Sequence, residues 1–289
     1  MDTQIKTHNI FISASEAQAL VGKVNVRFID VRPNEEYKAS HIPEAVNINE
    51  IFSYLGLSSK EGIENIKKDL GELFKAKGVN SEDYVIIYED CLKTYFGASC
   101  RGYFLFQLLG HSKVSIIKGG WEAWIKIKAP TSNELTKISS GNFKPGWNDS
   151  MWSGQSDIEK ALKTGNAKLL DVRDIDEWTG ESSSPYGKDF VPRKGRLPNA
   201  IYILWTDFMK LEDGLTVIKS PEEVRKLCEA KNITPEDNII VYCFKGARAS
   251  NTLLALKESG FKNVTNYFAS WNEWSKDFSL PIDEKKLIL

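Results

Sequence analysis

A thiol and two cations lie close together in residues 239–248, which read Ile-Ile-Val-Tyr-Cys-Phe-Lys-Gly-Ala-Arg. The apolar residues predict a buried strand that ends on Cys243, and a short loop with Lys245, Gly246 and Arg248 follows before a helix. Loop N–H groups and the positive end of the helix dipole would then face the sulfur. This setting favours an anionic, nucleophilic thiol, although a cysteine that ends an apolar strand is more often a small buried hydrophobe.

The other cysteines give a weaker signal. Cys100 and Cys228 lie in helical patterns and are predicted to belong to the core. Cys91 also follows an apolar strand, but no Lys-Gly-Ala-Arg sequence comes after it. Its loop is longer, with ten positions over residues 88–98 against six over residues 242–248. Catalysis by Cys91 is therefore not favoured.

Composition limits the class of protein. The chain has 289 residues, 42% hydrophobic and 27% charged, which is typical of a soluble globular protein with two domains. A net charge of −1 favours neither nucleic acid nor an anionic membrane. Four cysteines do not make a disulfide framework, and no C-x-x-C or H-x-x-x-H spacing predicts a metal site. Residues 1–8 lack the basic and apolar regions of a signal peptide, so we expect a cytoplasmic location without membrane spans.

The C-terminal half of the chain repeats the N-terminal half. Four pairs of segments match in the same order: 28–37 with 169–178, 41–47 with 196–202, 84–88 with 238–242, and 109–124 with 259–274. The repeat is about the size of a whole domain, which indicates a duplicated domain rather than a solenoid. We expect an N-terminal domain over residues 1–130 and a C-terminal domain over 151–289. Residues 131–150, rich in Ser, Thr, Asn, Gly and Pro, are the predicted linker.

Short apolar runs alternate with helical periodicity in both halves. Strands are predicted at 26–31, 85–88, 114–117, 169–172, 239–243 and 264–267, and helices at 13–21, 63–77, 97–109, 156–164, 221–231 and 247–259. Ser13 and Ser220 are predicted N-caps, and Gly110 and Gly260 are predicted helix stops. The alternation indicates an α/β fold, with mainly parallel sheets flanked by helices on both faces. Ligands of such sheets bind at the C-terminal strand ends, where Cys243 lies.

These residues resemble the rhodanese family in its tandem two-domain form. The resemblance rests on residues 171–173, 195–200, 242–250 and 260–274, and it covers nearly the whole chain. It implies that the second domain carries the catalytic Cys243 and that the first is inactive. When Gly110 is aligned with Gly260, Lys93 is placed opposite Cys243, which agrees with an inactive first domain.

The resemblance implies an enzyme, a thiosulfate sulfurtransferase. The Cys243 thiolate would take the outer sulfur of thiosulfate, sulfite would leave, and the persulfide would pass its sulfur to cyanide or another thiophilic acceptor. No cofactor or metal is expected, because sulfur itself is the transferred group. Donor and leaving group are anions, so a site of this kind needs fixed positive charge. The residues expected to bind the donor are Phe244, Lys245, Gly246, Ala247, Arg248 and Arg196.

Four further residues are expected to support the site. Asp171 is predicted to orient an arginine, Arg173 lies in the same motif, and Trp271 either packs in the core or walls the pocket. Glu177 stands where some two-domain members carry a substrate-binding arginine, and Phe244 stands where an arginine is common. These departures leave fewer cations for the donor.

Several alternatives stay open. One is 3-mercaptopyruvate sulfurtransfer on the same fold, although loops of that branch are small and uncharged. A phosphatase would need five residues between Cys and Arg, and this loop has four. A non-catalytic sulfur-carrier or binding module is a third reading. The sequence does not name the acceptor, and it leaves open the oligomeric state, with a monomer common for fused tandem domains. An insertion at 181–194 would either partly cover the site or have no role.

Overall fold

The computed structural model of the protein describes residues 9–284. The segment 1–8, on which the expected location rests, lies outside the described residues. The chain divides into two compact units. The first contains residues up to 54, 66–148 and 211–217, and the second contains 55–65, 149–210 and the residues from 218 onward. Among the described helices, none has the length and apolar character needed to cross a membrane.

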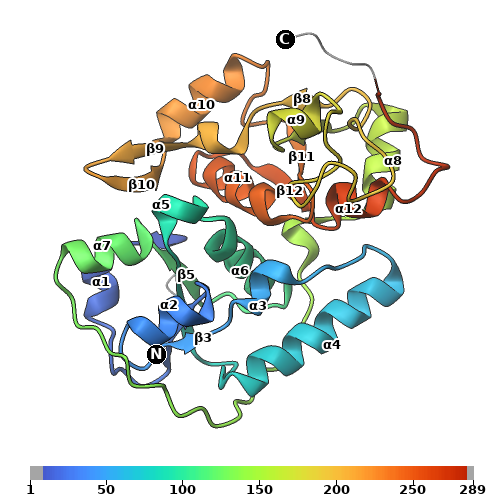
Figure 1. The fold of residues 1–289 in the computed structure, drawn as a ribbon. Coiled ribbons are helices and arrows are strands. Elements are labelled where there is room, and N and C mark those ends of the chain that lie inside the picture. The colour runs from blue at the N-terminus through green and yellow to red at the C-terminus, as the bar shows by residue number, and fades with distance from the viewer. Residues whose placement is uncertain (1–8, 285–289) are drawn as a thin grey trace, which may run out of the picture. The chain divides into compact units, whose positions relative to one another are not determined.

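The first unit is built on a five-stranded parallel sheet (Figure 1). Its strand order is β1 (Phe11–Ile12), β5 (Val114–Ile117), β4 (Tyr84–Tyr88), β2 (Val26–Asp30) and β3 (Val46–Asn47). The helices of this half of the chain are α1 (Ala14–Gln18), α2 (Asn34–Ala39), α3 (Glu50–Ser53), α4 (Lys60–Ala76), α5 (Cys91–Thr94), α6 (Gly97–Leu108) and α7 (Gly120–Lys126).

The second unit repeats this sheet, again with every pair of strands parallel. Its order is β6 (Trp152–Ser153), β12 (Asn263–Tyr267), β11 (Asn238–Tyr242), β7 (Lys168–Asp171) and β8 (Ile201–Tyr202). Its helices are α8 (Gln155–Thr164), α9 (Ile175–Trp178), α10 (Pro221–Glu229), α11 (Ala247–Glu258) and α12 (Ser270–Trp274). A separate two-stranded sheet joins β9 (Met209–Glu212) to β10 (Leu215–Ile218), and two short 3-10 turns lie at Asp149–Met151 and Trp205–Phe208. The matching strand order confirms the α/β fold and the duplication.

The predicted strands and helices all form, with ends that differ by a few residues. Ser13 and Ser220 cap their helices, each accepting a hydrogen bond from a backbone N–H three residues on, at 3.1 and 3.3 Å. Gly110 and Gly260 follow their helices with φ of 79° and 86°, as a helix stop requires. The edge strands β1, β3, β6 and β8 gave no sequence signal, because two residues are too few to show a period.

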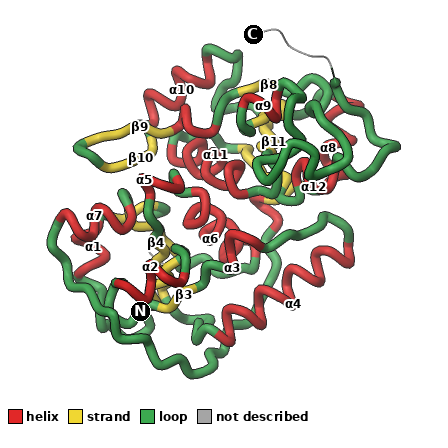
Figure 2. The backbone as a smooth tube through the Cα atoms, in the orientation of Figure 1, coloured by secondary structure: helices red, strands yellow, loops and turns green. Residues whose placement is uncertain are grey.

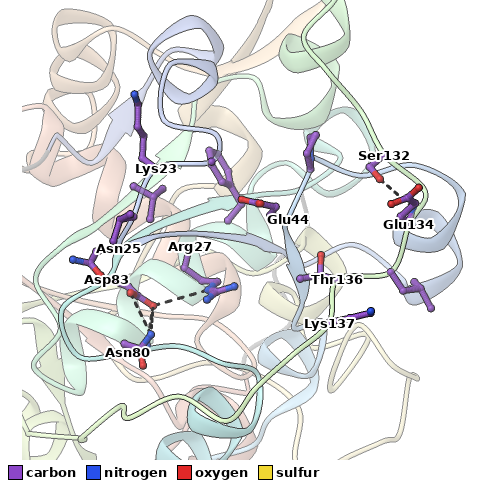
Figure 3. Close-up of a pocket in the computed structure, with 16 residues that line it drawn as sticks. Lys23, Asn25, Arg27, Glu44, Asn80, Asp83, Ser132, Glu134, Thr136 and Lys137 are labelled. Atoms are coloured by element: carbon purple, nitrogen blue, oxygen red, sulfur yellow. Dashed lines mark hydrogen bonds and ion pairs between the residues drawn. The ribbon is translucent and has the colours of Figure 1, made fainter.

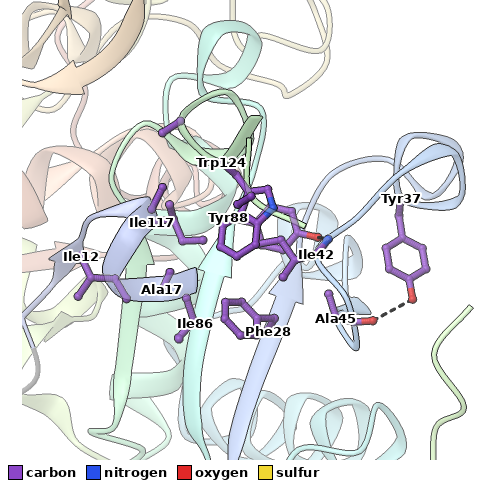
Figure 4. Packing of buried hydrophobic residues seen from close by; sticks show 13 residues of the cluster. Ile12, Ala17, Phe28, Tyr37, Ile42, Ala45, Ile86, Tyr88, Ile117 and Trp124 are labelled. Atoms are coloured by element: carbon purple, nitrogen blue, oxygen red, sulfur yellow. Dashed lines mark hydrogen bonds between the residues drawn. The ribbon is translucent and has the colours of Figure 1, made fainter. Parts of the chain in front are cut away.

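Each unit has its own apolar core. In the first, Phe28 meets Trp124 edge to face, with ring centroids 6.1 Å apart, and Ile86 and Tyr88 lie beside them (Figure 4). In the second, Ile240 and Tyr242 of β11 pack with buried residues of α8 and α12. Strands buried on both faces are typical of parallel sheets, and this burial explains the continuous apolar runs in the sequence.

The predicted linker 131–150 runs mostly without helix or strand. It is packed along the first unit up to residue 148. Phe143 is buried with its ring 5.3 Å from that of Phe74, and the Thr136 hydroxyl donates to the Ala45 carbonyl at 2.7 Å. This segment is therefore part of a folded unit along most of its length.

Candidate active site

Cys243 follows β11, the central strand of the second sheet. Its side chain is buried, and the Gly246 N–H donates a hydrogen bond to Sγ at 3.1 Å. Gly246 has φ of 83° and immediately precedes Ala247, the first residue of α11. The sulfur therefore lies in the loop that leads into the N-terminal, positive end of a twelve-residue helix. This is the arrangement that the sequence predicted.

The start of α12 holds the loop from the other side. The Ser270 hydroxyl accepts a hydrogen bond from the Cys243 N–H at 3.1 Å and donates to the Tyr267 carbonyl at 2.6 Å. The Trp271 N–H donates to the Cys243 carbonyl at 3.1 Å, and the Asn272 N–H donates to the Phe244 carbonyl at 2.9 Å. These bonds fix the backbone on both sides of the sulfur, which is what preorganisation of a reactive group requires.

Arg248 is held by carboxylates. Its Nη1 lies 2.5 Å from Glu177 Oε2 and 2.9 Å from Asp174 Oδ2, and its Nη2 lies 3.1 Å from Glu177 Oε1. Burial by itself would lower the pKa of Arg248, but the charge and hydrogen bonds of Glu177 outweigh it and raise the pKa. Arg248 thus remains a cation, but Glu177 and Asp174 largely offset the charge that was expected to bind the donor.

Asp171 orients Arg173, also as expected. Both side chains are fully buried, with Arg173 Nε 3.0 Å from Oδ1 and Nη2 2.6 Å from Oδ2 of Asp171. The guanidinium lies 4.7 Å from the ring centroid of Trp271, which is itself fully buried. Burial would lower the pKa of Arg173, but the Asp171 charge raises it more. Trp271 therefore serves as packing beneath this ion pair.

Arg196 is paired with the C-terminal segment of the second unit. Its Nη2 is 2.7 Å from Asp283 Oδ2, and its guanidinium lies 4.7 Å from the ring centroid of Trp178. Backbone bonds between Arg196 and Asp283 form an isolated bridge at the same place. These contacts fasten the C-terminal segment to the loop before β8.

Lys245 and Phe244 face the insertion at 181–194, which Figure 2 draws as loop between α9 and β8. The Lys245 Nζ lies 4.8 Å from the ring centroid of Tyr186. Phe244 is 2% exposed, and its ring lies 5.5 Å from that of Tyr186 and 5.8 Å from that of Phe190. The insertion therefore contacts the two residues that follow the thiol.

Sequence reasoning missed several residues of this site. Asp174 directly follows the Asp-Val-Arg motif, so its place beside a buried arginine was open to prediction. Tyr186 and Phe190 gave no clear signal, because their contacts with Phe244 depend on how the insertion folds. Ser270 gave no signal, because its role depends on how α12 meets the cysteine loop.

A hollow of about 430 Å³ lies between α9 and the insertion. Its lining residues are Asp174, Asp176, Glu181, Ser182, Ser184, Pro185, Gly187 and Lys188. Since Asp174 also contacts Arg248, this hollow adjoins the ion pair at the start of α11.

The equivalent loop of the first unit corrects one expectation. Tyr88 pairs with Asp30 as Tyr242 pairs with Asp171, so the residue that matches Cys243 is Glu89. The Trp121 N–H donates to the Glu89 carbonyl at 2.8 Å, just as that of Trp271 does to Cys243. The prediction that Lys93 stands opposite Cys243 is wrong, because an offset taken at the helix ends ignores the residues added to the first loop.

The Glu89 carboxylate fills the N-terminus of α6. It accepts hydrogen bonds from the Ser99 N–H at 2.7 Å, the Ser99 hydroxyl at 2.5 Å and the Ala98 N–H at 3.3 Å. Burial raises the pKa of Glu89, and these bonds act in the opposite direction. Burial and the charge of Glu89 also raise the pKa of Cys91 well above its usual value, which disfavours a thiolate.

A second hollow, of about 680 Å³, lies in the first unit (Figure 3). It is formed around the N-terminal ends of β2 and β4 and by residues 132–137. Arg27 lies 4.0 Å from Asp83, and Asp83 also accepts a hydrogen bond from the Asn80 N–H at 2.8 Å. Its lining contains neither a thiol nor an imidazole, so it does not provide the cysteine chemistry that the sequence predicts.

Comparison with known proteins agrees with this geometry. The model of the rhodanese-like domain matches the chain twice, at residues 13–127 and 155–277. A thiosulfate sulfurtransferase of Corynebacterium glutamicum is 30% identical over 281 residues, covering 94% of this chain and 89% of that protein. The sulfur carrier protein TtuD of Thermus thermophilus is 28% identical over 283 residues, covering 94% and 96%. The predicted tandem resemblance is confirmed.

Solved structures show the same fold. SseA of Escherichia coli, described as a 3-mercaptopyruvate sulfotransferase with the rhodanese fold, superposes with a TM-score of 0.75 at 21% identity. The match covers 91% of this chain and 99% of SseA. At this identity the likeness bears on the fold alone.

Proposed function

The chain belongs to the rhodanese-like domain family, and on that premise we propose that it is a sulfurtransferase that uses thiosulfate as donor. Cys243 is the nucleophile. Its thiolate attacks the outer sulfur of thiosulfate, the S–S bond of the donor breaks, and sulfite leaves with the bonding electron pair. The cysteine then carries a persulfide, which a thiophilic acceptor such as cyanide attacks to regenerate the thiolate.

The hydrogen bond from the Gly246 N–H to Cys243 Sγ is the observation that carries this proposal. It shows a sulfur aimed at the N-terminal end of α11, where backbone N–H groups favour negative charge. In the first unit the same kind of position holds the carboxylate of Glu89. We accordingly propose that the first domain is inactive and that transfer takes place in the second.

The residues of the cysteine loop have different proposed roles. Lys245 is the proposed donor-binding cation, Gly246 donates its N–H to the sulfur, and Ala247 is the first residue of α11. Arg248 shapes the loop through Glu177, while Phe244 connects the loop to the insertion. Asp171, Arg173 and Trp271 support the neighbouring strand end.

One observation favours 3-mercaptopyruvate as the second candidate donor. Glu177 and Asp174 offset the charge of Arg248, so the loop is less positive than its sequence suggests. A donor with a single carboxylate needs less positive charge than a dianion does. Thiosulfate remains the first candidate because Lys245 lies in the loop itself.

Donor loading followed by intact mass tests the proposal. The chain is mixed with thiosulfate or 3-mercaptopyruvate, and peptide mapping locates any gain of one sulfur atom. We expect the gain on Cys243, its loss in Cys243→Ala, and full loading in the matched variant Cys91→Ala. Loading that persists in Cys243→Ala would refute the mechanism. Faster loading by 3-mercaptopyruvate would make it the proposed donor in place of thiosulfate.

A further inference from the structure

The insertion at 181–194 is a folded loop with its own internal bonds. Ser182, Ser183 and Ser184 are buried, and so is Val191, which belongs to the apolar core of the second unit. The Ser183 hydroxyl accepts a hydrogen bond from the Val191 N–H at 3.1 Å, and the Ser183 N–H donates to the Lys188 carbonyl at 2.9 Å. These bonds close the loop on itself and leave its aromatic side chains in defined positions.

Two aromatic side chains of the insertion meet the cysteine loop. Tyr186 and Phe190 lie 5.7 Å apart, and both contact the ring of Phe244. Tyr186 is 47% exposed and Phe190 is 55% exposed, whereas Phe244 is buried. The three rings form an aromatic cluster that connects the insertion to the residue next to Cys243.

Tyr186 also contacts a charged residue of the cysteine loop, Lys245. Its ring centroid lies 4.8 Å from Nζ of Lys245, within the range of a cation–π interaction. Lys245 is 7% exposed, and a cation held away from water is attracted more strongly by a ring face.

We propose that Tyr186 is a positioning residue for sulfur transfer, and that its ring holds the Lys245 ammonium group where it attracts a doubly charged donor. The insertion thereby sets the donor preference of the site. This inference rests on the proposed function, because it assigns a role in binding the donor of the same reaction.

The test compares Tyr186→Leu, Tyr186→Phe and the control Phe190→Leu with two donors at a fixed cyanide concentration. The donors are thiosulfate, a dianion, and an alkanethiosulfonate, which carries one negative charge. We expect Tyr186→Leu to raise KM for thiosulfate about five-fold with kcat within about two-fold, and to change KM for the thiosulfonate less. Tyr186→Phe keeps the ring and recovers most of the loss. Phe190→Leu removes the other ring and leaves the ratio of the two KM values unchanged.

A double-mutant cycle connects the effect to the lysine. In a Lys245→Ala background, Tyr186→Leu should add little to KM for thiosulfate, because the cation that the ring positions is gone. Additive losses, or equal losses for both donors, would overturn the inference and leave the proposed function intact. Failure of the wild-type chain to gain sulfur from either donor, measured by intact mass, would overturn the proposed function and this inference with it.

Discussion

At the scale of single residues, charge pairing describes three of the arginines that the sequence assigned to the site. Arg173 and Arg248 each face a buried carboxylate, and Arg196 faces Asp283. Removal of one partner from a buried pair leaves the other charge without compensation, at a cost of about 3–5 kcal/mol in stability. The three arginines are therefore expected to hold the local structure around them rather than to bind the donor.

Replacement of Glu177 by Gln tests this reading. We expect Glu177→Gln to lower the free energy of unfolding by about 2–3 kcal/mol, because Asp174 still offsets part of the Arg248 charge. The control is Asp174→Asn, whose side chain is 44% exposed and should cost less than about 1 kcal/mol. Urea denaturation of both variants measures the difference, and similar losses would contradict the assignment.

A second residue-scale prediction concerns pH. Burial, with the hydrogen bond to Asp90, raises the pKa of Glu122 to about 7 from an ordinary value of 4.5. Between these two pH values the folded protein keeps a proton that the unfolded chain has lost, so stability falls as pH rises through this window. Glu122→Gln should flatten that fall. Urea midpoints of both proteins at pH 5 and pH 7.5 measure this fall in stability. An equal fall in the variant would show that Glu122 is not its cause.

At the scale of elements, the turn into α11 depends on Gly246. A Cβ there would lie 2.6 Å from Phe268 Cδ2 and 2.8 Å from the Phe268 carbonyl oxygen. Gly260 has a similar positive φ of 86°, but a Cβ there would meet nothing within 4 Å. A comparison of alanine substitutions at these two glycines therefore separates the cost of crowding from the cost of backbone strain.

We expect Gly260→Ala to cost only the left-handed strain, about 1–2 kcal/mol, and Gly246→Ala to cost at least about 2 kcal/mol more. Gly246→Ala should also slow the gain of sulfur by Cys243, because the N–H of residue 246 would move away from the Cys243 sulfur. Thermal unfolding and the mass assay report the two effects. Equal stability of the two variants would show that the site near Phe268 adapts to a methyl group.

At the scale of the whole molecule, sequence halves and folded units do not coincide. Residues 55–65 belong to the second unit and residues 211–217 to the first. Ser58 contributes to the second unit, where its N–H and hydroxyl both lie 2.7 Å from carboxylate oxygens of Glu273. Its hydroxyl also accepts a hydrogen bond from the Gln155 N–H at 2.9 Å.

Ser58→Ala should therefore destabilise the protein by about 1–2 kcal/mol, through loss of a hydrogen bond to a charged group. The control Ser53→Ala removes an exposed hydroxyl that bonds only to the Glu50 carbonyl one turn back, and should cost less than about 0.5 kcal/mol. Chemical denaturation followed by tryptophan fluorescence measures both. A neutral Ser58→Ala would mean that residues 55–65 contribute little to the second unit.

The sequence by itself determined the α/β elements, the duplication and the thiol at the end of a central strand. These depend on local periodicity and on short motifs, and they formed as predicted, from the Ser220 cap to the turn at Gly246. The sequence predicted the wrong counterpart of Cys243 in the first domain. The loop of that domain contains extra residues, and an alignment anchored only at the helix ends does not detect them.

The tertiary structure alone decided how the charges of the site are distributed. Arg248 meets Glu177 from 71 positions away, and Arg196 meets an aspartate 87 positions away. The insertion brings Tyr186 to Lys245 across a similar separation. The composition gives only the number of these charges. Whether a cation attracts a donor depends on the groups that folding places beside it, because the Coulomb energy falls with distance and is larger in a buried setting.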